Sequence, residues 1–273
     1  MTNTIQTNSS SLAAQTSLLN TNNNVNNGFQ RQASGSRINS ARDDAAGLVI
    51  ANQLSAELVA QNTGIRNAND GISIAQVAEG ALQEVTNILQ RSRELALTAA
   101  SGQNSAEGRE ALNAEFQALG EEVARIAAST EFGGQNLLAD NSSFAIQVGA
   151  ESGDSISVET PNISTLASVF NSQDLSSADN ASAALDVIDQ QIVAIDLSRT
   201  ELGATQNQLT SSISNIQNNA ENTAASRSRI SDFDFASGVS EQARNNILQQ
   251  VAIAVQGQAN ITGRNALQLL SNS

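Results

Sequence analysis

Apolar residues recur at every seventh position over a long stretch of the C-terminal half of the chain. The main row consists of Ile188, Ile195, Leu202, Leu209, Ile216, Thr223 and Ile230. A companion row, three residues ahead of it, consists of Leu185, Ile192, Ile213 and Ala220. Two such rows form the seam along which helices pack in a coiled coil. The pattern predicts one long helix over residues 182–229.

Two more apolar stripes predict helices in the N-terminal half. The first combines Ile74, Ala81, Ile88 and Leu95 with Ala78, Val85, Ser92 and Ala99. We expect this helix to end near Gly102 and the next to begin near Asn104, with Glu107 as a capping signal. The stripe of that next helix consists of Leu112, Phe116, Leu119, Val123 and Ile126. Glu121 and Arg125 have the spacing of a stabilising ion pair on its surface.

Between residues 130 and 181 the helical pattern stops and strands become more favourable. Phe144, Ile146 and Val148 alternate with polar residues, and so do Ile156 and Val158. The segment between these runs, residues 149–154, has the composition of a turn. We therefore predict a β-hairpin over about residues 143–159, followed after Pro161 by a surface loop.

Both ends of the chain have the pattern of thin amphipathic helices. Near the N-terminus Ile5, Leu12 and Leu19 are seven residues apart. Near the C-terminus the stripe consists of Val239, Ala243, Ile247, Val251, Ala254, Gln258 and Ile261. Ordering a residue costs about 1–2 kcal/mol, which such thin stripes offset poorly. We expect both ends to be disordered in an isolated monomer and helical when neighbours cover them, with residues 232–234 forming a break and N-cap before the last helix.

Together these elements predict a mainly α fold, a long antiparallel helical hairpin or coiled-coil bundle with a small β-hairpin. The sticky, nearly neutral ends of such a subunit would associate between copies. Contacts between two non-equivalent faces propagate into a helical filament. A monomeric or dimeric coiled-coil protein is the alternative that the pattern leaves open.

The amino-acid composition excludes most kinds of catalytic chemistry. The 273 residues include no His and no Cys, and all 13 basic residues are Arg. Thiolate and imidazole nucleophiles, the usual zinc sites, and the lysine of a P-loop or Schiff base are therefore excluded. The neighbouring acids Asp43 and Asp44, or Glu121 and Glu122, point to different sides of a helix. We expect no enzymatic activity, no cofactor and no metal.

Charge and hydropathy exclude two kinds of partner. The chain carries 27 acidic residues and a net charge of −14. Nucleic acids and anionic membranes are bound through dense Lys and Arg, so neither is an expected partner. No apolar stretch approaches the roughly 18–20 residues that span a bilayer, and no basic start precedes an apolar run. We expect no membrane insertion and no ordinary signal peptide.

Several segments, taken in order, resemble the conserved blocks of bacterial flagellins. The first is SGSRINSARDDAAGL at residues 34–48, followed by NANDGISIAQ and AEGAL at residues 67–76 and 78–82. Further blocks are TEFGGQNLL at residues 130–138, IQVGA at 146–150, LGATQN at 202–207, ASRSRI at 225–230 and ILQQ at 247–250. Each block is a weak signal, but the ordered set over nearly the whole chain is specific.

This resemblance implies a structural subunit of the extracellular flagellar filament, used for swimming motility. It implies export through the flagellar type III secretion channel with a chaperone, polymerisation beneath a distal filament cap, and contact with hook–filament junction proteins. Residues 1–42 and 231–273 would form the inner-tube domain, called D0 in flagellins. Residues 43–181 and 182–230 would form the next domain, D1, and the outer surface domains would be absent.

The resemblance also assigns roles to particular residues. Those of the connector between the domains are Arg37, Asn39, Asp43 and Asp44. A patch sensed by a vertebrate Toll-like receptor would contain Arg91, Leu95 and Glu115, for which axial subunit packing is the competing role. A terminal segment for assembly, the chaperone and intracellular flagellin receptors would contain Ile247, Leu248, Val251, Leu267, Leu269 and Leu270. The alternatives to a flagellin are a hook–filament junction protein and a freestanding secreted coiled-coil adhesin.

Overall fold

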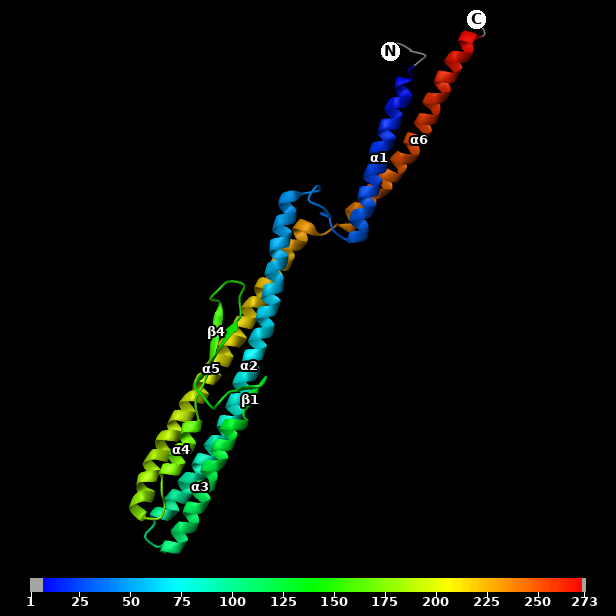
Figure 1. Cartoon of the computed structure of the whole chain (residues 1–273). Helices are drawn as coiled ribbons and strands as arrows, with labels where there is room; N and C mark the ends of the chain where they lie inside the picture. The colour runs from blue at the N-terminus through cyan, green and yellow to red at the C-terminus, as the bar shows by residue number, and fades with distance from the viewer. Residues whose placement is uncertain (1–6, 272–273) are drawn as a thin grey trace. The chain divides into compact units, whose positions relative to one another are not determined.

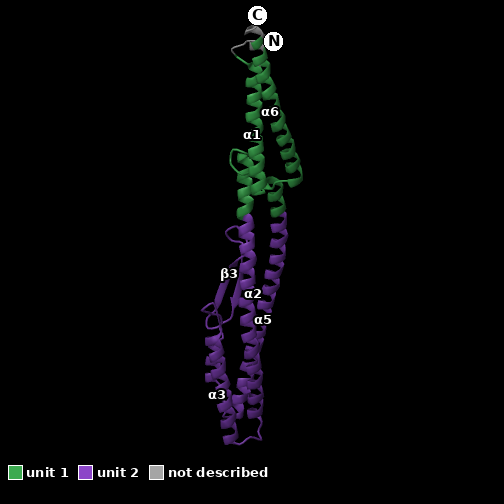
Figure 2. Cartoon of the chain, turned by 90° about the vertical axis from the view of Figure 1, so that its right-hand side faces the viewer, with its two compact units in different colours: residues 1–56, 223–273 green, residues 57–222 purple. Residues whose placement is uncertain are grey.

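The computed structural model describes residues 7–271, which form two compact units. Unit 1 contains residues 1–56 and 223–273, and unit 2 contains residues 57–222 (Figure 2). The helices of the described residues are α1 (Ser9–Ser34), α2 (Ala45–Ala100), α3 (Ala106–Ser129), α4 (Ser164–Ser172), α5 (Ala178–Ser231) and α6 (Phe235–Ser271) (Figure 1). The strands are β1 (Glu131–Phe132), β2 (Gln135–Asn136), β3 (Ser142–Gln147) and β4 (Ser155–Thr160). Ile5, the first residue of the predicted N-terminal stripe, lies outside the described residues.

The core of unit 2 is the pair of apolar seams that the heptad spacing predicts. On α5 the buried residues of the main row within this unit are Ile188, Ile195, Leu202, Leu209 and Ile216. On α2 the residues without exposed surface include Ala78, Leu82, Val85, Leu89 and Ala99. Polar bridges between the two helices flank this core, and Arg93 pairs with Asp189 at 2.6 Å. The predicted seams are therefore confirmed, and α5 extends slightly beyond both predicted ends.

Ser92 occupies a core position of α2 without leaving a polar group unsatisfied. Its side chain is fully buried, and its hydroxyl donates a hydrogen bond to the carbonyl of Ile88 at 2.8 Å. The oxygen of Ile88 belongs to the preceding turn of the same helix, a common partner for a serine inside a helix. The polar interruption of the seam is thus tolerated locally.

The stretch after Pro161 contains a helix, so the predicted surface loop is wrong for α4. Leu166 and Phe170 stand four residues apart and are both buried. The ring of Phe170 lies 4.8 Å from that of Phe116 on α3, and a side chain at Gly120 would overlap Phe170. Two apolar residues on one face were enough to dock a short helix, although serine and asparagine dominate the composition around them.

Two local features of α3 differ from the prediction. The N-cap is Ser105, whose hydroxyl accepts a hydrogen bond from the N–H of Gly108 at 3.1 Å. Arg125 pairs with Glu122, three residues away, and the predicted pair with Glu121 is not formed. Both i,i+3 and i,i+4 neighbours are within reach on a helix surface, so spacing alone does not choose between them.

The predicted β-hairpin is confirmed by β3 and β4. The strands are antiparallel, with Phe144 opposite Val158 and Ile146 opposite Ile156. The hairpin rests on α2, where a side chain at Gly64 would overlap the backbone carbonyl of Val148. A second small hairpin, β1 and β2, turns at Gly133 and Gly134, which both have positive φ. Its two-residue turn uses the conformation that glycine adopts without strain.

Unit 1 contains the two terminal helices, which lie side by side (Figure 1). They are antiparallel, because Asn8 contacts Ala259 whereas Asn22, further along α1, contacts Gln249. No helix among residues 7–271 combines the length and hydropathy needed to cross a membrane.

Candidate assembly surfaces and the connector of the terminal helices

Two chain segments cross next to the terminal helices and are joined through their backbones. Gly35 ends α1 in the left-handed conformation, with φ of 66°. Its carbonyl accepts a hydrogen bond from the N–H of Phe233 at 3.0 Å, and the N–H of Arg37 donates to the carbonyl of Ser231 at 2.7 Å. Ser36 and Asp232 form an isolated antiparallel bridge between these bonds. The break after α5 is therefore fixed to the break after α1.

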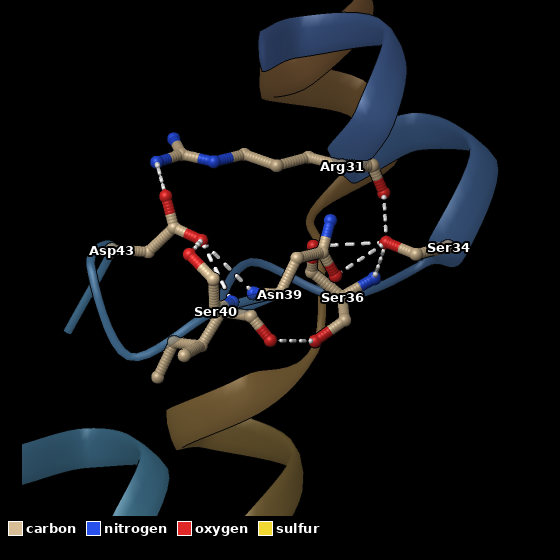
Figure 3. Close-up of polar contacts among 7 residues, drawn as sticks. Arg31, Ser34, Ser36, Asn39, Ser40 and Asp43 are labelled. Carbon is tan, nitrogen blue, oxygen red and sulfur yellow. Dashed lines mark hydrogen bonds and ion pairs between the residues drawn. The ribbon is translucent and has the colours of Figure 1, made fainter. Parts of the chain in front are cut away.

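Asp43 organises the segment that leads from α1 to α2 (Figure 3). Its Oδ2 accepts hydrogen bonds from the N–H of Asn39 at 3.2 Å, and from the N–H and hydroxyl of Ser40 at 2.9 and 3.0 Å. Its other oxygen lies 3.8 Å from the guanidinium of Arg31. The Ser40 hydroxyl, followed by the two backbone N–H groups, holds the pKa of Asp43 below its ordinary value of 3.8. Stabilisation of the charged form explains the direction.

The other residues predicted for the connector lie in the same structure. Arg37 donates a hydrogen bond to the carbonyl of Ile230 at 2.6 Å. Asn39 accepts one from the hydroxyl of Ser34 at 2.8 Å. Asp44 accepts one from the N–H of Gly47 at 2.8 Å, at the start of α2. All four predicted connector residues therefore make hydrogen bonds, and Asp43 accepts one of them from the N–H of Asn39.

Asp234 confirms the predicted break before the last helix. Its Oδ1 accepts hydrogen bonds from the N–H groups of Ala236 and Ser237 at 2.9 and 3.4 Å. These N–H groups, at the positive end of α6, lower the pKa of Asp234 from its ordinary value. An acidic N-cap satisfies donors that the helix itself leaves without acceptors.

Many large apolar side chains of the terminal helices are exposed, although Val25 of α1 is buried. On α1, Leu12 and Leu19 are 61% and 58% exposed. The exposed apolar side chains of α6 are Phe235, Val239, Ile247, Leu248, Val251, Ile253, Val255 and Ile261. The predicted terminal residues Ile247, Leu248 and Val251 belong to this set, whereas the side chains of Leu267, Leu269 and Leu270 lie outside the described residues. Apolar residues that line an exposed helix face are typical of surfaces that pack against further protein.

The predicted receptor-recognition patch lies on unit 2. Two of its residues are at the surface, and the third belongs to the core. The guanidinium of Arg91 pairs with Glu115 on α3 at 2.8 Å and with Glu94 at 3.0 Å. Glu115 is the largest influence that raises the pKa of Arg91. Leu95, in contrast, is only 3% exposed and belongs to the core. Arg91 and Glu115 are therefore the members that a partner could contact directly in this chain.

Sequence reasoning missed the partners that hold these residues in place. Arg31 and Ser40 support Asp43, but neither has a distinctive sequence pattern. Gln242, buried against Gly28 between α1 and α6, was also missed. Its position on the side of α6 opposite the apolar stripe was the available signal.

Long helices, a small hairpin and uncovered apolar faces on the terminal helices define a structural subunit that packs against further protein. Comparison with known sequences identifies the family to which this subunit belongs. The profile of the bacterial flagellin N-terminal helical region matches residues 5–143, and that of the C-terminal helical region matches residues 185–270. The chain belongs to the bacterial flagellin family. It is a structural subunit of the extracellular flagellar filament, which forms by self-polymerisation.

Individual relatives agree with this assignment. The flagellin of Halalkalibacterium halodurans is 42% identical over 253 residues, which cover 90% of this chain and 93% of the relative. Flagellin A of Vibrio cholerae is 33% identical over 380 aligned positions, which cover 99% of this chain and all of the relative. That length exceeds the 273 residues present here, so the Vibrio protein contains segments without a counterpart in this chain.

Solved structures show the same fold. The crystal structure of Bacillus cereus flagellin is 28% identical, with a TM-score of 0.50, and covers 59% of this chain and 94% of its own. A structure described as a flagellar hook-associated protein of Vibrio parahaemolyticus is 15% identical, with a TM-score of 0.58. It covers 70% of this chain and 100% of its own, and at that identity it shows the fold alone. The family match favours a flagellin over the junction protein and the adhesin.

The connector should lose stability in acid. A carboxylate whose pKa is lowered in the folded state contributes stability above its unfolded pKa, about 3.9 for Asp, and loses it as pH falls through the folded pKa. Asp43→Asn should therefore lower the temperature at which filaments dissociate at pH 7, and the difference from wild type should shrink below about pH 4. Light scattering during heating at several pH values measures this, with Asp70→Asn, an exposed acid on α2, as the control. An Asp43→Asn filament with the same melting curves as Asp70→Asn would contradict the role given to Asp43.

Proposed function

We propose that the terminal helices carry the main subunit-to-subunit contacts of the filament. Residues 1–42 and 231–273 would form the inner-tube domain D0, and residues 43–181 and 182–230 the surrounding domain D1. The connector between α1 and α2, together with the break between α5 and α6, supports this division. The boundary between the two compact units differs from this domain boundary. It falls within α2 and α5, because those helices continue past the connector.

The observation that carries the proposal is the outward direction of the apolar side chains on α1 and α6. Full burial of a branched apolar side chain contributes about 1.5–3 kcal/mol. Residues such as Ile247 and Val251 remain more than half exposed within one chain, so most of this free energy is gained only when another copy covers them. Head-to-tail contacts of this kind repeat without closing and produce a helical polymer. Ordering of the ends by neighbouring copies stays a prediction.

We also infer that the chain has no catalytic role. The amino-acid composition supports this inference, since it contains no His, Cys or Lys. The acids of the connector are engaged in caps and turns, where Asp43 and Asp44 hold different backbone N–H groups. Their positions fit a structural function.

Polar substitutions on the outward face of α6 should weaken polymerisation. Val251→Asn should raise the critical concentration for seeded growth by roughly three- to tenfold, because Val251 is 51% exposed in the single chain and covering this half contributes about half of the 1.5–3 kcal/mol of full burial. The control is Val193→Asn, the same substitution at an exposed valine of α5, outside the terminal helices. Sedimentation of seeded filaments measures both variants. Equal critical concentrations for the two would exclude this face as a subunit contact.

The same outward face of α6 is a surface for the flagellar export chaperone before secretion. A chaperone that covers it would prevent polymerisation inside the cell, and the exposure of Ile247, Leu248 and Val251 supports this use. The distal cap and the hook–filament junction proteins would cover the uncovered terminal helices at the two ends of the filament.

Deletion of residues 240–273 should abolish chaperone binding, because it removes the proposed surface. A pull-down of purified chaperone with the full-length and truncated chains measures the effect. The Val251→Asn variant should show intermediate binding if the contact is apolar. Undiminished binding by the truncated chain would refute this proposal.

Recognition by a vertebrate Toll-like receptor would use the exposed pair Arg91 and Glu115, with Leu95 acting from the core as a support. Arg91→Ala should reduce affinity for the receptor ectodomain by roughly ten- to hundredfold, as expected for a charged hydrogen bond of about 1.5–3 kcal/mol. Surface plasmon resonance with Arg125→Ala as the control measures this, because Arg125 is another exposed arginine paired with a glutamate. Unchanged affinity for Arg91→Ala would remove the receptor role. Intracellular flagellin receptors would instead engage the C-terminal segment.

A further inference from the structure

A cleft in unit 1 lies beside the backbone bridge that joins the connector to the break after α5. Three arginines line it, namely Arg31 near the end of α1, Arg37 in the connector and Arg229 in the last turn of α5. Phe233 forms part of its wall, and its volume is about 550 Å³. Binding pockets commonly have volumes of this order. We call this feature the arginine cleft.

Most N–H groups of these three guanidiniums have no acceptor within the described part of the chain. Arg37 donates one hydrogen bond, to the carbonyl of Ile230 at 2.6 Å. The guanidinium of Arg31 lies 3.8 Å from Asp43, which is longer than a hydrogen bond. Arg229 is exposed, and its side chain makes no hydrogen bond or ion pair with the described residues. Each guanidinium has five N–H donors, so the cleft can donate further hydrogen bonds to an acidic partner.

Three carboxylates also line the arginine cleft, and they leave its arginines available. Asp234 caps α6, and Asp232 accepts a hydrogen bond from the hydroxyl of Ser231 at 3.1 Å. Among the described residues, neither these two acids nor Glu241 forms an ion pair with the arginines of the cleft. The three carboxylates would repel a small free anion. An acidic side chain that belongs to a protein surface gains further contacts around the cleft, so a protein partner is favoured.

The distribution of charge along the chain indicates which protein surface this is. Unit 1 contains seven arginines and five acidic residues, whereas unit 2 contains six arginines and 22 acidic residues. The net charges of the two units are therefore +2 and −16. Complementary charges favour contact between unlike units of two copies and oppose contact between two acidic units. Because the chain self-polymerises, the acidic unit 2 of a second copy is the partner that these charges select.

We propose that the arginine cleft binds acidic side chains from unit 2 of a second copy of this chain in the filament. Arg229 is the principal contact residue, because its side chain gives up no partner within the described part of its own chain. Arg31 and Arg37 contribute further charge-assisted hydrogen bonds. This contact uses a different surface from the apolar face of α6, so it goes beyond the function proposed above.

Arg229→Gln should weaken polymerisation without unfolding the monomer. The critical concentration for seeded growth should rise roughly three- to tenfold, because charged hydrogen bonds between copies are lost. Arg229→Lys should recover only part of this loss, since lysine keeps the charge but not the planar fork of donors. The control is Arg227→Gln, two positions away and thus about 200° around α5, outside the cleft. Sedimentation of seeded filaments measures all variants, and equal critical concentrations for Arg229→Gln and Arg227→Gln would overturn the proposal.

Salt dependence separates an ionic contact from a change in helix stability. The ratio of the critical concentrations of Arg229→Gln and wild type should fall toward one as sodium chloride is added, because salt screens a contact that the variant lacks. Far-UV circular dichroism of the two monomers should be the same. A ratio that does not change with salt would contradict an ionic role for Arg229.

A cross-link between copies identifies the occupant. The chain has no cysteine, so Arg229→Cys provides a single attachment site for a photoreactive maleimide. The test uses filaments in which a minority of this variant is mixed with isotope-labelled wild type. Mass spectrometry should find cross-links between the two isotopic forms, with the second peptide from residues 57–222. Cross-links to unit 1 alone, or only within one copy, would overturn the proposal.

Sulfate tests the other possible occupant, a small free anion. At constant ionic strength, sulfate should raise the dissociation temperature of wild-type filaments no more than that of Arg229→Gln filaments. Selective stabilisation of the wild type would show that a free anion fills the cleft and would overturn the proposal. The proposed contact through the apolar face of α6 fails separately, through normal growth of Val251→Asn, which is measured without any change to the cleft.

Discussion

The helix α6 contacts α1 through small and polar side chains, and the behaviour of the subunit depends on this constraint. A helix pair in a soluble monomer normally turns its apolar stripe toward its partner. Here α6 presents Gln242 and Gln249 to α1 and leaves Ile247 and Val251 exposed. The exposed apolar surface of α6 is therefore available for contacts with further protein. Stability of the ends and polymerisation are thus linked.

The core of unit 2 and the connector are each stabilised by contacts of their own. Unit 2 has a continuous apolar core on α2 and α5, which contains residues such as Leu82 and Leu202, and it does not need the terminal helices for its packing. The connector uses hydrogen bonds in place of apolar contacts. Gly35 and Asp43 fix the exit from α1, and Asp234 fixes the start of α6. Local hydrogen bonds thereby fix the exit from α1 and the start of α6.

Sequence reasoning predicted the elements whose apolar spacing is regular and missed those that depend on a few contacts. The heptad row through Ile195 and Leu209 was sufficient to predict α5. The alternation of apolar and polar residues was sufficient to predict β3 and β4. The helix α4 was missed because two buried residues, Leu166 and Phe170, determine it within a polar stretch. The connector residues were found through family resemblance, but their partners Arg31 and Ser40 were not, because a side chain that satisfies a local turn has no periodic signature.

The direction of the α6 side chains could have been read from the sequence only in part. The stripe through Val239 and Ile261 was evident, but the pattern did not show whether it faced α1 or a neighbouring copy. In the structure Gln242 packs against Gly28 on the other side of α6, which is a three-dimensional contact without a sequence period. A cryo-electron microscopy map of the filament, at a resolution that shows side chains, tests the central claim most directly. We expect Ile247 and Val251 to be buried against neighbouring subunits, with Gln242 against Gly28 of the same subunit; a map in which the apolar stripe of α6 packs on α1 of its own chain would contradict this.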